Sequence, residues 1–121
     1  LISGLRKVVD HYNVNALSQI AASTALDEID YMKSNVVRIR ATRERLEKAL
    51  KALGFYVWDS NANFVLARIE SPPAAELHRI LKERCILVRY FNEVRLENCL
   101  RISVGTDIEN DRLIKELTDI I

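Results

Sequence analysis

The sequence predicts an α/β two-layer domain in which a small, mainly antiparallel sheet carries helices packed on one face. Three observations predict this class. Helix and strand patterns follow in the order helix, helix, strand, strand, helix, strand, strand, helix, with no strand-rich tract and no glycine-rich phosphate loop. The strand patterns come in two pairs, each joined by a short polar link. Alternation along the last strand leaves one apolar face and one face that carries an arginine.

The first half of the chain is predicted to be helical. The expected elements are a short helix over 1–9, a loop over 11–15, and helices over 16–29 and 31–53. Asp30 is a plausible N-cap for the long helix, and Gly54 is expected to end it. Arg43 interrupts the apolar stripe of this helix. The basic and acidic residues on its other side predict a solvated, ion-paired face rather than a nucleic-acid surface.

The second half contains the predicted sheet. Strands are expected over 55–58, 62–69, 86–92 and 99–106, because these runs are rich in β-branched and aromatic residues. Ser71 can cap the helix between the two strand pairs. Thr106 and Glu109 form a capping box that opens a final helix. The inward stripe of this helix is predicted to be Ile108, Leu113, Ile114, Leu117, Ile120 and Ile121.

The composition excludes several classes of function. The chain has 121 residues, and 18 basic against 17 acidic side chains leave a formal charge of +1. This balance argues against nucleic acid or an anionic membrane surface as the main partner. No apolar run has the length of a membrane span and no segment resembles a signal peptide, so a cytoplasmic location is expected. Cys85 and Cys99 lack metal-ligand spacing and are expected to be reduced, structural thiols. His78 is expected to be a surface residue.

Two arginines are the candidate functional residues. In the run 99–106, alternation puts Leu100, Ile102 and Val104 on one face and Cys99, Arg101 and Ser103 on the other. Arg89 lies on the preceding strand and comes near Arg101 if the two strands are neighbours. Two converging guanidinium groups would form a fork for a carboxylate or a phosphate. The alternative is a solvent-exposed sheet face on which each arginine packs its stem over apolar neighbours.

Three segments resemble one enzyme family. They are ILVRYFNEVRLENCLRISVGTDIEND, which begins at Ile86, YNVNALSQ, which begins at Tyr12, and NANFVL, which begins at Asn61. In order and separation they are similar to the C-terminal part of the histidinol-phosphate aminotransferases, which use pyridoxal phosphate and have the aspartate aminotransferase fold type. The resemblance covers essentially the whole chain. It implies that 1–30 is an inter-domain segment with a connecting helix, and that 31–121 is the C-terminal small domain.

The resemblance also implies roles for individual residues. Arg101 corresponds to the principal ligand of the substrate anion, with Arg89 as its helper, and Asn13 and Asn15 would lie near the mouth of the active site. Asn side chains also commonly cap helices, so both interpretations of these two residues stay open. Cys85 stands where the family commonly has glycine, which predicts backbone strain if this position needs a positive φ.

The family's cofactor-binding lysine lies upstream of the matched region. Lys33, Lys48, Lys51, Lys82 and Lys115 all fall in predicted helices with polar neighbours. We therefore expect this chain alone to be inactive and to bind no pyridoxal phosphate. Activity would require the large domain, small-molecule substrates and, by resemblance, a homodimer. Two alternatives remain: a related pyridoxal-phosphate enzyme, such as an aromatic aminotransferase or a threonine-phosphate decarboxylase, and a non-catalytic dimerisation module.

Overall fold

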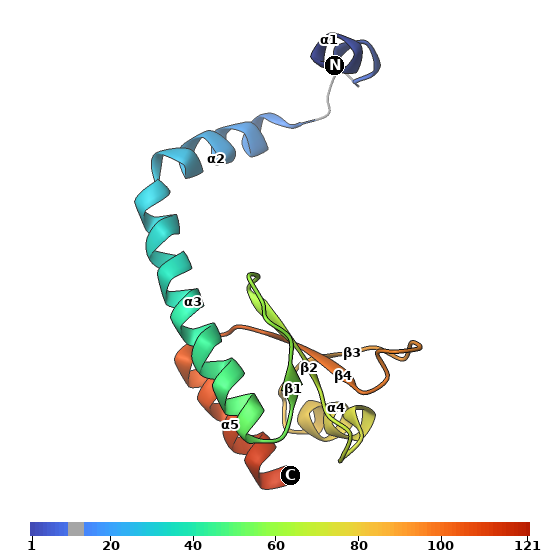
Figure 1. Ribbon diagram of the computed structural model, residues 1–121. Helices are drawn as coiled ribbons and strands as arrows, with labels where there is room; N and C mark the ends of the chain where they lie inside the picture. The colour runs from blue at the N-terminus through green and yellow to red at the C-terminus, as the bar shows by residue number, and fades with distance from the viewer. Residues whose placement is uncertain (10–13) are drawn as a thin grey trace. The chain divides into compact units, whose positions relative to one another are not determined.

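The computed structural model describes residues 1–9 and 14–121, which divide into two compact units (Figure 1). Unit 1 is Leu1–Asn35 and unit 2 is Val36–Ile121. The helices are α1 (Ile2–Val8), α2 (Ala16–Asp27), α3 (Ile29–Ala52), α4 (Ala74–Glu83) and α5 (Asp107–Ile120). The strands are β1 (Tyr56–Val57), β2 (Phe64–Arg68), β3 (Arg89–Tyr90) and β4 (Cys99–Ser103). Because α3 crosses the boundary between the units, the predicted functional division after residue 30 stays a prediction.

Unit 1 consists of α1, α2 and the first turns of α3. Neither α1 nor α2 contains a buried residue, although both carry apolar side chains such as Leu5, Leu17 and Ile20. The helix α2 begins at Asn15, whose side chain accepts a hydrogen bond from the Ser18 backbone N–H at 2.8 Å. The prediction that Asp30 caps the next helix is wrong. Helix α3 begins at Ile29, one residue before Asp30, so Asp30 lies inside the first turn. There its negative charge interacts favourably with the positive end of the helix dipole.

Unit 2 is built on a four-stranded sheet with the strand order β1-β2-β4-β3. Every neighbouring pair is antiparallel. In β2 the side chains of Val65 and Ala67 are buried while Phe64 is exposed, as the alternation predicts. In β4 Leu100 and Ile102 are buried and Arg101 is exposed. This confirms the predicted α/β class with a small antiparallel sheet.

The three helices of unit 2 pack on a single face of the sheet. The C-terminal half of α3 runs beside α5 in Figure 1, and α4 lies against β3 and β4. Their buried side chains join those of the sheet in one apolar core, formed by Leu46, Leu50, Phe55, Val57, Val65, Ala67, Ile69, Ala74, Leu77, Leu81, Leu100, Ile102, Leu113 and Leu117. Since this core occupies one side of the sheet, the opposite face is left without a covering helix within unit 2.

Helix ends in unit 2 show where local chemistry was predicted well and where it was not. The capping box of α5 is confirmed, with Thr106 accepting from the Glu109 backbone and the Glu109 carboxylate accepting from the Thr106 N–H. Ser71 does not cap α4, because that helix starts at Ala74 with Pro73 as its N-cap and has no side-chain cap. Ile108 was expected in the core but is 83% exposed, since it occupies the outer side of the first turn of α5.

Backbone conformation confirms the prediction for Cys85. Its φ is +59°, in the left-handed region that favours glycine. Gly54 ends α3 with a φ of +88°, as expected for a residue in the C′ position. His78 on α4 is half-buried rather than fully exposed, because its ring stacks on Tyr90 at a centroid distance of 5.8 Å. No helix in the described part of the chain is both long enough and apolar enough to cross a membrane.

Candidate functional site

The helix-free face of the sheet brings the two candidate arginines together. Arg89 on β3 is the direct register partner of Arg101 on β4. In an antiparallel sheet, residues that are directly opposite project from the same face, with their Cβ atoms about 5 Å apart. Both arginines are exposed. The two side chains therefore leave the sheet side by side, as an anion-binding fork requires.

Neither guanidinium group has an acidic partner among the residues that the structure describes. Among residues 1–9 and 14–121, the ion pairs within 4.0 Å involve other basic residues, and the side-chain hydrogen bonds include neither Arg89 nor Arg101. Each guanidinium instead lies over an aromatic ring, with Arg101 5.4 Å from the centroid of Phe64 and Arg89 5.5 Å from that of Phe91. Two unpaired like charges directly opposite one another are unfavourable. A bound anion between them would remove that repulsion.

Other residues on this face are engaged with one another. Arg68 contacts the Glu70 carboxylate at 3.3 Å and lies 5.7 Å from the centroid of the Tyr56 ring. Tyr56 in turn packs edge-to-face against Trp58. This aromatic cluster was not predicted from the sequence. The alternation of residues in 55–58 and 62–69 could have predicted it, because it places Tyr56, Trp58 and Arg68 on one face once the two strands are paired. The paired Arg68 is a weaker anion ligand than Arg89 or Arg101, because Glu70 already neutralises it.

Cys99 differs from the sequence-based expectation. Alternation put it on the same face as Arg101, yet its side chain is fully buried. Burial raises the pKa of the Cys99 thiol, while the nearby Arg68 opposes that shift. An enclosed thiol with a raised pKa fits the predicted structural role.

Arg43 is a buried residue whose role the sequence pattern did not reveal. It donates a hydrogen bond to the backbone carbonyl of Ala62 at 2.7 Å and lies 3.7 Å from the Glu47 carboxylate. Only 8% of Arg43 is exposed. The contact fixes the turn before β2 to helix α3, and so sets where Phe64 begins the strand. Its position in the apolar stripe of the helix was the available signal.

The predicted asparagine ligands are not brought to this face by any described contact. Asn13 lies outside the described residues. Asn15 belongs to unit 1, where its side-chain oxygen caps α2. The capping interpretation is thus supported for Asn15, and a role for either residue toward a substrate stays a prediction.

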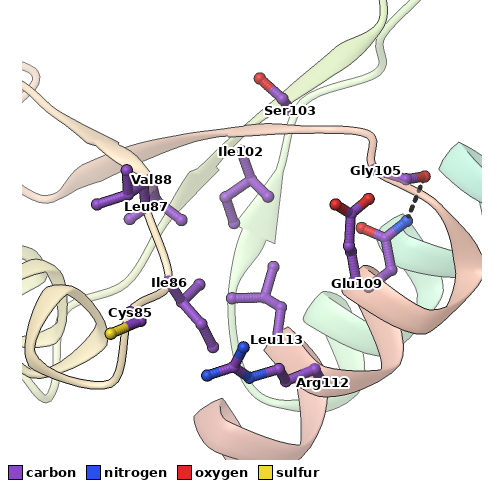
Figure 2. Close-up of a pocket in the computed structure, with 11 residues that line it drawn as sticks. Cys85, Ile86, Leu87, Val88, Ile102, Ser103, Gly105, Glu109, Arg112 and Leu113 are labelled. Atoms are coloured by element: carbon purple, nitrogen blue, oxygen red, sulfur yellow. Dashed lines mark hydrogen bonds between the residues drawn. The ribbon is translucent and has the colours of Figure 1, made fainter.

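A separate cavity of about 300 Å³ lies between β4, the 85–88 segment and α5 (Figure 2). Three of its polar side chains already have partners. Glu109 accepts from Thr106, the Asn110 amide donates to the Gly105 carbonyl at 3.0 Å, and Arg112 donates to the Arg84 carbonyl at 2.7 Å. Ile102 and Leu113 supply an apolar wall on the core side of the sheet. Because these three side chains are already hydrogen-bonded, the cavity is a weaker candidate for an anion site than the arginine pair.

All six lysines of the chain are exposed. The expectation that the cofactor-binding lysine lies upstream of this chain stays a prediction. Among the described residues no cluster of three or more His, Cys, Asp or Glu side chains could hold a metal ion.

Comparison with known proteins identifies the family. The model of the family "Aminotransferase class I and II" matches residues 1–117. The chain belongs to this family. Among curated relatives of this aminotransferase chain, histidinol-phosphate aminotransferase 1 of Trichormus variabilis is 44% identical over 121 residues, covering 100% of the chain and 35% of the relative. The histidinol-phosphate aminotransferase of Microcystis aeruginosa is 45% identical, with 100% and 35% covered.

Solved structures agree with the aminotransferase fold. A candidate aminotransferase from Burkholderia pseudomallei matches 98% of the chain and 36% of its own length, with a TM-score of 0.89 and 32% identity. The histidinol-phosphate aminotransferase of Sinorhizobium meliloti, solved in complex with pyridoxal-5'-phosphate, has a TM-score of 0.78 and 25% identity, covering 98% of the chain and 33% of its own. The aminotransferase chain thus spans about a third of the length of the relatives it matches.

Proposed function

We propose that this chain is the C-terminal part of a histidinol-phosphate aminotransferase, in which Arg101, helped by Arg89, binds the anionic groups of the substrates. The proposed reaction moves an amino group from histidinol phosphate to 2-oxoglutarate, giving imidazole acetol phosphate and glutamate in histidine biosynthesis. The likeness to curated histidinol-phosphate aminotransferases over the full chain supports the reaction. The observation that supports the role of the residues is the direct pairing, on the open sheet face, of two arginines that have no acidic partner within the described part of the chain.

The chemistry of the two substrates explains why paired arginines suit this reaction. One half-reaction presents a phosphate and the other presents carboxylates, so one site must accept both kinds of anion. A guanidinium group binds either one with two parallel N–H donors, and it stays charged at every physiological pH. The two arginines can bind the anionic group of the substrate, which is distant from the reacting carbon, and thereby orient the substrate. The unfilled donors of Arg89 and Arg101 support this assignment.

Pyridoxal phosphate, when bound, supplies the electron sink that transamination needs. We also propose that the residues that hold the cofactor belong to the remainder of the full-length enzyme, as the family resemblance implies. This chain would contribute substrate binding and orientation. We further propose that the full-length enzyme is a cytoplasmic homodimer, and the exposed apolar side chains of unit 1 support association of that unit with another surface.

The test is a kinetic comparison of full-length variants. Arg101→Gln should raise the KM of both histidinol phosphate and 2-oxoglutarate by about 30-fold or more, equal to about 2 kcal/mol of binding at 1.4 kcal/mol per tenfold change. Arg89→Gln should have a smaller effect of the same kind. Arg79→Gln is the matched control, because Arg79 is an exposed helical arginine paired with Glu83. Unchanged KM values for Arg101→Gln toward both substrates would exclude the proposed role.

Substrate identity needs a second measurement. Arginine pairing alone would equally serve an aromatic aminotransferase or a threonine-phosphate decarboxylase. A panel of histidinol phosphate, phenylalanine and threonine phosphate separates them, and the proposal predicts the highest kcat/KM for histidinol phosphate. A higher kcat/KM for either other substrate would refute it. The mass of the full-length enzyme in light scattering tests the homodimer, and a monomer would contradict that part of the proposal.

A further inference from the structure

The ring of Phe64 lies under the guanidinium group of Arg101. The register pairs Phe64 with Ser103 and Leu66 with Arg101, so Phe64 is the diagonal neighbour of Arg101 on the adjacent strand. The Arg101 Cζ is 5.4 Å from the ring centroid, which is within the range of a cation–π contact. Phe64 is 37% exposed, so a large part of its surface is available to the arginine and to a bound ligand.

This contact orients the arginine without occupying its donors. A phenyl ring has no oxygen or nitrogen acceptor, so this contact forms no conventional hydrogen bond with the five N–H groups of the guanidinium. The donors of Arg101 therefore stay free for a bidentate anion. Arg43 provides the contrast, because its donors are taken up by the Ala62 carbonyl and the Glu47 carboxylate. An arginine with both its orientation fixed and its donors free is suited to bind a ligand.

Sheet order separates the aromatic contacts of the two arginines. The strands run β2-β4-β3, so Phe64 and Arg89 lie on opposite sides of Arg101. Arg89 has a contact of its own at 5.5 Å with the ring of Phe91, which lies two residues further along the chain, just beyond β3. The ring of Phe64 therefore contacts only one arginine of the pair, Arg101.

We propose that Phe64 is a positioning residue, which holds the guanidinium of Arg101 in the orientation that binds the substrate anion. This inference rests on the proposed function, because it presumes that Arg101 binds substrate. The ring reduces the conformational freedom that Arg101 loses on binding an anion. Its loss weakens binding of both substrates, because both use the same guanidinium.

The experiment is a double-mutant cycle in the full-length enzyme. Phe64→Leu should raise the KM of both substrates by about threefold to tenfold, the range of a partly exposed cation–π contact, with kcat changed by less than about twofold. Phe64→Tyr should stay near the parent, because it keeps the ring. In the Arg101→Gln background, Phe64→Leu should have no further effect on KM. Tyr56→Leu is the matched control, because Tyr56 is an aromatic residue of the same face whose ring lies under Arg68 instead.

A second series keeps the shape of the side chain and covers the case in which Phe64→Leu fails to fold. Phenylalanine analogues with one, two or three ring fluorines at position 64 progressively weaken the negative face of the ring. The KM should rise stepwise with fluorine count in the parent and stay flat in Arg101→Gln. A flat series in the parent, or an equal rise in both backgrounds, overturns the inference. If Arg101→Gln still raises KM in that case, the proposed function survives alone, whereas no effect of Arg101→Gln refutes both.

Discussion

The buried contact of Arg43 allows the sharpest test of how this fold is held together. Replacing Arg43 with Met keeps an unbranched side chain in the apolar stripe of α3 but removes the charge. Two groups then lose their partner: the Ala62 carbonyl, which accepts at 2.7 Å, and the Glu47 carboxylate at 3.7 Å. Arg43→Met should therefore destabilise unit 2, even though methionine is the more apolar residue.

The size of this effect follows from burial. The side chains of Arg43 and Glu47 are 10% and 16% exposed, so water reaches each of them only partly. A hydrogen bond from a charged donor contributes about 1.5–3 kcal/mol. The Glu47 Oε1 atom has no hydrogen-bond partner among the described residues even in the presence of Arg43. Since the long contact to Glu47 adds little, Arg43→Met should lower the free energy of unfolding by about 2–3 kcal/mol, most of it from the lost hydrogen bond to Ala62.

Urea unfolding of the 121-residue chain, followed by circular dichroism, measures this loss as a shift of the midpoint at constant m value. The double variant Arg43→Met/Glu47→Met should recover a small part of the loss, because it leaves no buried carboxylate without a cation but does not restore the hydrogen bond to Ala62. Glu47→Met alone should cost less than Arg43→Met, since Arg43 would still donate to Ala62. Parent-like stability of Arg43→Met, or a double variant below the single one, would refute the reasoning.

Three further outcomes are expected of the same chain. Leu77→Ala should lower the free energy of unfolding by about 2–5 kcal/mol, because Leu77 is fully buried. Ile108→Ala should change it by less than about 0.5 kcal/mol, because Ile108 is exposed. Equal urea midpoints for the two variants would contradict both assignments. Cys85→Gly should raise the free energy of unfolding by about 1 kcal/mol by relieving the positive φ, while Cys85→Ala should not. A gain of the same size for alanine would show that strain is not the cause. Hydrogen bonding to Arg45 lowers the pKa of Asp107 in the folded protein. The ionised carboxylate therefore stabilises the fold at pH values above its unfolded-state pKa. This contribution is lost as the pH falls through the lower, folded-state pKa. Asp107→Asn should thus be less stable than the parent at pH 7, with the two stabilities converging in acid; a constant difference across the pH range would contradict this linkage.

Much of the fold could be predicted because unit 2 obeys simple periodicities. Helix α5 has its capping box and buried residues at positions 110, 113 and 117, and β2 alternates between core and open face, as β4 does from Leu100 onward. These signals are local, so a sequence window contains all the information they need. The ends of elements were predicted less well. Whether Asp30 or Glu28 precedes α3, and whether Ser71 reaches α4, depends on the path of the chain between helices rather than on the residue type.

The run 86–92 shows why a strand pattern does not by itself determine pairing. Its residues alternate, with Ile86 and Val88 packed against the core and Leu87 exposed, yet only Arg89 and Tyr90 pair with β4. The 85–88 segment lines the cavity beside α5 instead of pairing with β4. On the opposite edge of β4 the pairing with the β2 side extends beyond the strand, because the Val104 N–H donates to the Asn63 carbonyl. Pairing depends on a second strand, and that partner's path was not readable from the run itself.

The candidate site combines one property that sequence reveals and one that only the fold reveals. The alternation predicted that Arg101 faces away from the core, but no local pattern says which residue of a neighbouring strand lies opposite it. A shift of one residue in the pairing of β3 would put Tyr90 beside Arg101 and turn Arg89 toward the helices. The two half-buried residues Val88 and Tyr90 pack against the core and so prevent that shift. The register of the arginine pair is thus set by apolar packing on the opposite face of the sheet, so substitutions at Val88 or Tyr90 that disturb it should impair substrate binding without touching a substrate.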